Sequence, residues 1–292
     1  MSIYVRSLGK ICVDAYEACE WFQSLPISKS PNNRLEQINN YISYKLLNPA
    51  TPEGESFEHG IADIDTYYVL SDGAGFGLIA KEMKKLSPQL CPKGTLRDIL
   101  QGSLKPSDET TNDSDARNKF VELELAAHLS KAGFKLLGFD DLKFEIEGIE
   151  YQVQCKRPSN IRTLDSNIER AYQQLEARLH QNDSRGIIAI AVEKIFDLDQ
   201  GFQSMLSSSD ISEFGKQIGQ KFKTKVDKFN SQWIDTRVVG ILAIIRFLFK
   251  IEGTQEVGAS YNCGLIMFAS FKFAQEADEQ RLLRMVSQLQ SG

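Results

Sequence analysis

Four polar side chains in the middle of the chain could together bind a divalent metal ion. Two are the carboxylates of Glu122 and Asp141, and two are the amide of Gln154 and the ammonium of Lys156. Carboxylate and carbonyl oxygens suit the hard ions Mg²⁺ and Mn²⁺. A lysine beside such an ion could stabilise an attacking hydroxide or the charge developing on a phosphate. The set therefore points to phosphodiester cleavage, provided that the fold brings the four groups together.

A predicted β-hairpin positions three of these groups. Residues 141–146 alternate polar and apolar side chains, which is the period of a half-buried strand, and residues 149–156 form a second strand. Glu147-Gly148 between them suits a tight turn, because glycine tolerates positive φ. About this turn position 141 lies opposite position 154, and opposed side chains share a face of the sheet. Three of the four groups are therefore expected on one face: Asp141, Gln154 and Lys156.

The fourth group lies on a predicted amphipathic helix, residues 115–131. Glu122 precedes Leu125, Ala126 and Leu129 by three, four and seven residues, so it lies on the same apolar stripe. We therefore expect its carboxylate to face the hairpin rather than water.

Other interpretations of these residues remain open from the sequence. The charged hairpin side chains could form an ordinary solvated sheet face, and Glu122 could pair with Lys119 at the margin of its helix. Glu145 has the same strand parity as Asp141 and is an alternative to it. Glu124 is an alternative to Glu122.

The order of these motifs resembles the PD-(D/E)xK nuclease superfamily, in which a helical Glu and a strand-opening Asp precede the lysine element. The helix through Val121 to Phe134 resembles the first helix of archaeal Holliday-junction resolvases. The string 154–157, Gln-Cys-Lys-Arg, resembles Mrr-type restriction nucleases, in which Gln replaces the usual acid. The resemblance covers residues 115–192, a minority of the chain. Two departures are Asp140, which stands where the family has proline, and the neutral Gln154.

The resemblance implies an α/β fold with a restriction endonuclease-like α-β-β-β-α-β core around a central mixed sheet. It implies a Mg²⁺- or Mn²⁺-dependent endonuclease, with nucleic acid as the partner and DNA as the expected substrate, and it suggests a role in restriction or phage defence. Glu122, Asp141, Gln154 and the backbone carbonyl of Cys155 would hold the metal. Lys156 would orient or activate the water. The alternative is an inactive nuclease fold that serves in binding or assembly.

Two further residues are expected to contact the substrate. Arg157 follows the lysine, as a phosphate contact or as a charge on the rim of the site. In many relatives a Gln or Tyr on the next helix, here residues 165–180, reaches towards the metal. The matching residues are Tyr172, Gln173 and Gln174. Tyr172 lies on the apolar stripe and is expected in the core, so Gln174 is the candidate.

The composition indicates a globular protein. Of the 292 residues 42% are hydrophobic and 25% charged, so the chain can bury a core without cross-links. The five cysteines include no Cys-x-x-Cys pair, and with three histidines they give no zinc-site spacing. We expect a cytoplasmic protein with free thiols and no membrane span, because the longest apolar run, residues 238–245, is too short.

The net charge of −5 argues against a protein that coats DNA through an overall basic surface. It argues less against a nuclease, since metal ions and a local basic rim can hold the backbone. Lysines on a predicted helix, residues 212–229, would form a phosphate-contacting or a solvated face. A homodimer would supply two sites for the two strands of a duplex.

Three segments differ in character. Residues 1–103 hold six of the eight prolines and several helical patterns, which indicates a helical N-terminal domain. Within it, the glycine-rich residues 73–77 are expected to form a loop rather than a nucleotide-binding fingerprint. Residues 104–114 form a polar linker and residues 115–292 the nuclease-like domain. The last segment contains further predicted elements: strands at 186–192, 238–246 and 265–273, a helical insertion at 203–229 and a closing helix at 277–289.

Overall fold

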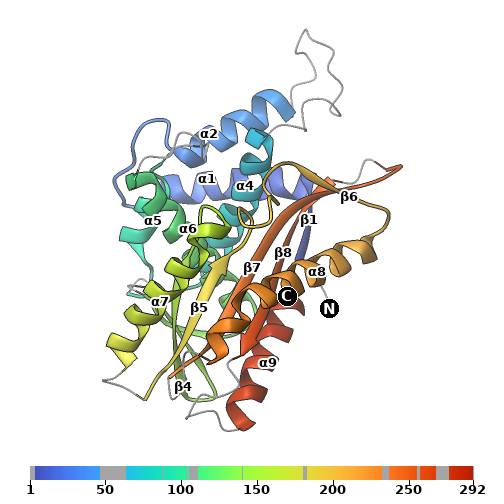
Figure 1. The fold of residues 1–292 in the computed structure, drawn as a ribbon. Coiled ribbons are helices and arrows are strands. Elements are labelled where there is room, and N and C mark those ends of the chain that lie inside the picture. Colours follow the sequence, from blue (N-terminus) through green and yellow to red (C-terminus); the bar gives the residue numbers. More distant parts are fainter. Residues whose placement is uncertain are drawn as a thin grey trace.

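The computed structural model describes residues 4–46, 64–87, 89–102, 104, 111–139, 141–179, 183–231, 237–254, 257–267 and 276–291. Within these ranges the chain forms a mixed α/β fold in which helices pack on both faces of one sheet (Figure 1). The same ranges contain no helix with the length and apolar character needed to cross a membrane.

The sheet has the strand order β1-β8-β7-β5-β4-β3-β2, and β6 pairs with the far end of β7. β4, β5 and β7 run parallel to one another, and the remaining neighbours on the main path are antiparallel. The central strands are apolar because both of their faces are covered. The strands are β1 (Tyr4–Ser7), β2 (Lys135–Gly138), β3 (Leu142–Ile146), β4 (Ile149–Lys156), β5 (Arg185–Ala191), β6 (Phe202–Met205), β7 (Val238–Ile251) and β8 (Val257–Met267).

Two groups of helices bury the two faces. The first group shares one apolar core with side chains of β3, β4 and β8; it comprises α1 (Leu8–Ser24), α2 (Arg34–Tyr41), α4 (Ile64–Met83), α5 (Lys93–Ile99), α6 (Thr111–Lys131) and α9 (Glu276–Ser291). The second group packs on the other face of β5 and β7; it comprises α7 (Leu164–Leu179) and α8 (Ser208–Val226). Figure 1 shows α8 crossing in front of β7 and β8. Short helical turns complete the chain: η1 (Ile42–Leu46), η3 (Ile161–Thr163) and η4 (Asp227–Ser231).

The predicted hairpin is confirmed in position and register. Leu142 pairs with Val153 and Ile146 with Ile149, so the two strands turn about Glu147-Gly148 as expected. Both turn residues have positive φ, 50° and 81°, which fits the right-handed twist of the flanking strands. Asp141 directly precedes β3, and continuing the same register places it opposite Gln154.

The segment expected to form a separate N-terminal domain, residues 1–103, shares the sheet and the apolar core of the segment expected to form the nuclease-like domain. Residues 4–7 form β1, which pairs with β8 in the main sheet. Side chains of α1 and α4 also belong to the same apolar core as α6 and β4. The described parts of residues 4–100 therefore complete the core and the sheet rather than folding as a separate cap. Most of the predicted linker lies outside the described residues.

The glycine-rich residues 73–77 are not a loop but the middle of α4. A Cβ added at Gly75 would lie 2.5 Å from Phe120 Cζ and 2.8 Å from Glu124 Oε1, both on α6. Glycine is therefore required here by the close approach of two helices, an interaction between distant segments that a local pattern does not reveal.

Three strand predictions need correction. The periodicity indicated neither β2 nor β6. Most of β6 lies in the segment 203–229, which was expected to be helical. β8 begins at Val257, not at residue 265, and the end of the predicted strand, residues 268–273, lies outside the described residues. The closing helix is confirmed as α9.

Candidate active site

The end of β4 presents its polar side chains to α7. Val153 and Cys155 point into the core beneath α6, so Gln154 and Lys156 alternate onto the opposite face. There Gln154 accepts a hydrogen bond from Arg178, and Lys156 donates one to Gln174, both on α7. The predicted alternation along this strand therefore holds.

Asp141 lies beside Gln154, as the register requires. Arg178 Nη1 is 2.6 Å from Asp141 Oδ1 and 3.2 Å from Gln154 Oε1, so one guanidinium nitrogen joins both residues. This arginine was not among the predicted site residues. The sequence could have indicated it, because Arg178 follows Gln174 by four residues on the same helix and residues four apart share a helix face.

Lys156 is half-buried, and its Nζ lies 2.9 Å from Gln174 Oε1. Burial lowers the pKa of the Lys156 ammonium, and the positive charge of Arg170 lowers it further. The partner of Gln174 is thus Lys156 at the end of β4.

Glu122 lies on α6, which packs on the other face of the sheet from α7. Burial raises the pKa of its carboxyl to about 7, and the negative charge of Asp141 raises it further. The charges of Lys119, Arg178 and Lys156 act in the opposite direction. Glu122 therefore lies within electrostatic range of Asp141 before the hairpin, of Lys156 at its end and of Arg178 on α7.

The structure also places the two alternative acids. Glu124 is fully turned into the interior, with its Oε2 3.1 Å from Arg246 Nη1. Glu145 lies on the outer part of the hairpin, with its Oε2 3.1 Å from the exposed Lys135. Of the four acids considered, Asp141 binds Arg178 beside Gln154, and Glu122 lies within electrostatic range of Asp141, Arg178 and Lys156.

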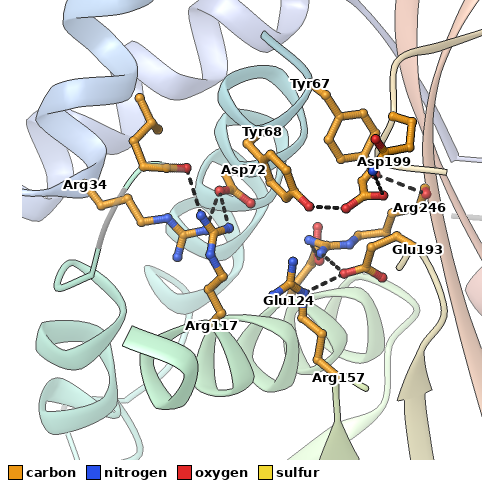
Figure 2. A network of polar contacts seen from close by, with 12 residues as sticks. Arg34, Tyr67, Tyr68, Asp72, Arg117, Glu124, Arg157, Glu193, Asp199 and Arg246 are labelled. Carbon is orange, nitrogen blue, oxygen red and sulfur yellow. Dashed lines mark hydrogen bonds and ion pairs between the residues drawn. The ribbon is translucent and has the colours of Figure 1, made fainter. Parts of the chain in front are cut away.

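Arg157 differs from its expected role as a phosphate contact or rim charge. Its side chain is 5% exposed, and its Nε lies 2.8 Å from Glu193 Oε1. Figure 2 shows the guanidinium directed into a buried network. The reason is the pleat, which sends the residue after Lys156 to the face opposite the site.

This network links the sheet to the N-terminal helices. Arg246 of β7 binds both Glu193, with a nitrogen–oxygen distance of 2.8 Å, and Glu124. Burial alone would raise the pKa of Glu193, but the guanidiniums of Arg246 and Arg157 outweigh it and lower this pKa to about 2. Glu193 is therefore ionised near neutral pH and paired on two sides.

A second part of the network surrounds Asp72 of α4 (Figure 2). Its Oδ2 accepts from Arg34 of α2 and, at 3.1 Å, from Arg117 of α6. These charges outweigh burial and lower the pKa of Asp72 to about 2. Tyr68 donates to Asp199 nearby. Sequence reasoning missed the network because its members are dispersed among segments that read as ordinary amphipathic helices and strands.

The donor set at the candidate site fits a hard divalent ion. Asp141 and Gln154 direct one oxygen each at a single cationic group, and the charge of Asp141 acts on the carboxyl of Glu122. Oxygen donors of this kind bind Mg²⁺ or Mn²⁺. The candidate set contains only two acids, with an amide as its third side-chain donor. Within the described ranges no group of three or more His, Cys, Asp or Glu side chains is arranged to hold a metal.

Comparisons of the chain with protein-family models, with curated proteins and with solved structures each gave no match.

Proposed function

We propose that the chain is a metal-dependent nuclease that hydrolyses phosphodiester bonds, with DNA as the substrate. The observation that carries the proposal is the convergence at the end of β4. Asp141 and Gln154 share Arg178, while Lys156 binds Gln174 one turn away on the same helix. Two acids, an amide and a half-buried ammonium from three elements are the groups that this chemistry needs.

The arrangement of the surrounding elements supports the same function. α6, β2, β3, β4, α7 and β5 follow one another in the order α-β-β-β-α-β, and the four strands are neighbours in the sheet in chain order. This is the order expected of a restriction endonuclease-like core, here extended by β7, β8 and β1 beyond β5. The candidate site lies at the end of β4, where Gln154 and Lys156 contact α7.

Each residue has a role that follows from its position. Glu122, Asp141 and Gln154 would hold the ion, with the Cys155 carbonyl as a further oxygen donor. A bound Mg²⁺ or Mn²⁺ lowers the pKa of a coordinated water and polarises the phosphate. The Lys156 ammonium orients the attacking water and offsets charge on the phosphate, and Gln174 fixes the ammonium through their 2.9 Å hydrogen bond.

Cleavage assays with the purified protein test the proposal. With Mn²⁺ or Mg²⁺ the protein should nick or degrade DNA, and Lys156→Ala should abolish this activity. Lys135→Ala on β2 is the control, because Lys135 is also a strand lysine but is 68% exposed and pairs with Glu145. Activity that survives in Lys156→Ala would reject the assignment. Parallel reactions with RNA identify the preferred nucleic acid.

A second candidate function is a nuclease fold that binds or assembles without cleaving. The neutral Gln154, which leaves a set of two acids within the described residues, favours it. Calorimetric titration with Mn²⁺ separates the two functions, because an assembly module without a metal site gives no heat of binding.

A further inference from the structure

We propose that Arg178 is an internal competitor of the divalent cation, which holds the metal-binding oxygens until the ion displaces it. This inference rests on the proposed function, since it concerns the same site. It adds a residue that controls metal affinity.

The position of one atom carries the inference. Arg178 Nη1 is 2.6 Å from Asp141 Oδ1 and 3.2 Å from Gln154 Oε1, so it contacts both oxygens at once. An ion that coordinates the same two atoms at about 2.1 Å needs the same space. The positive charge of the guanidinium adds repulsion at short range. The arginine and the ion therefore exclude each other.

The arginine is also able to leave. Its side chain is 35% exposed and lies in the last turn of α7, whereas the side chains of Arg157 and Arg246 are each 5% exposed in the buried network. A partly exposed ion pair costs less to break than a buried one, because solvent screens it and both partners regain hydration on separation. Release of Arg178 needs a change of side-chain rotamer and no movement of the helix.

Arg170 provides a matched control on the same helix. It lies eight residues before Arg178, is exposed, and acts on the site through its charge on Lys156. Replacing either arginine by glutamine removes one positive charge from α7. Only Arg178→Gln removes the group that contacts both Asp141 and Gln154.

Titration of the intact protein with Mn²⁺ by calorimetry, without nucleic acid, tests the inference. Arg178→Gln should bind Mn²⁺ about tenfold more tightly than the wild type, since one charge-assisted hydrogen bond no longer has to be broken. Arg170→Gln should remain within about threefold of the wild type. If Arg178→Gln does not fold, Arg178→Lys should show a smaller gain, because lysine lacks the planar guanidinium that joins two acceptors.

The outcomes distinguish this inference from the proposed function. Tighter Mn²⁺ binding in Arg178→Gln, but not in Arg170→Gln, supports both the role of Arg178 and the proposed metal site. Equal affinities in Arg178→Gln and Arg170→Gln, with clear Mn²⁺ heat in the wild type, overturn the role of Arg178 and leave the metal site standing. If neither the wild type nor the variants give heat, the metal site itself is absent and both proposals fall.

Discussion

Lys156 Nζ and Gln174 Oε1 lie 2.9 Å apart where β4 packs against α7. The hydrogen bond joins the ammonium at the end of a buried strand to the middle of an amphipathic helix. It gives a half-buried charge an acceptor that water would otherwise have to supply. The helix therefore acts on the candidate site through a positioning residue, and this dependence can be measured.

Gln174→Ala should slow Mn²⁺-dependent cleavage about tenfold, because the loss of a hydrogen bond to a charged group is worth about 1.5 kcal/mol. The measurement is single-turnover cleavage of DNA at saturating protein. Gln173→Ala is the control, since Gln173 is its exposed neighbour on the same helix. Equal rates for the two variants would remove Gln174 from the site.

Glu122→Gln should stabilise the metal-free protein above pH 7 by about 1–2 kcal/mol. The pKa of Glu122 is raised from 4.5 to about 7, so between these values the folded state binds more protons than the unfolded state. Wild-type stability therefore contains a component that decreases as pH rises from about 4.5 to 7. Urea unfolding in EDTA at pH 5 and pH 8 measures this pH-dependent component of the free energy of unfolding. The Glu122→Gln variant should lack it. Glu145→Gln, at a surface pair, should leave the pH dependence unchanged.

Asp72→Asn should destabilise the protein by about 3 kcal/mol at pH 7, because Arg34 and Arg117 lose their shared buried carboxylate. The folded pKa of about 2 is below the ordinary 3.8, so the pairing stabilises fully above pH 3.8 and is lost as pH falls through about 2. Denaturant unfolding at pH 7 and pH 2 should show the deficit shrinking in acid. Asp98→Asn, in a partly exposed pair, should cost under about 1 kcal/mol.

Gly75→Ala should destabilise the protein by about 1–3 kcal/mol, although alanine is the better helix former, because its Cβ would collide with Phe120 and Glu124. Gly94→Ala on α5 is the matched control. A Cβ there meets nothing within 4 Å, so the substitution should leave thermal stability equal or slightly higher. Similar melting temperatures for both variants would contradict the close packing of α4 on α6.

The sequence was sufficient for elements whose signal is local. The periodicity of α6 and α7 and the turn at Glu147-Gly148 predicted two helices and a hairpin in the correct register. From that register alone, Asp141, Gln154 and Lys156 could be expected on one face. Glu122 followed from its place on an apolar stripe, which the raised pKa of its buried carboxyl supports.

The features that the sequence did not reveal depend on contacts between distant segments. Gly75 looked like part of a loop because its partner helix lies about 45 residues further along the chain. Arg157 was expected at the surface because the buried Glu193 that binds it cannot be distinguished from an exposed acid by local pattern. The membership of β1 in the main sheet had no local signal, since a four-residue strand is shorter than any reliable periodicity.

The pairing of β1 with β8 has a consequence for how the molecule is made. Tyr4 is synthesised long before its partner Tyr261, with all the elements from α1 to β7 between them. The elements of the candidate site, α6 to β5, are contiguous in the chain and can assemble before that edge is closed. A deletion of β1 would leave the backbone groups of residues 258–261 of β8 open to neighbouring chains, so it would reduce solubility during expression before it altered chemistry.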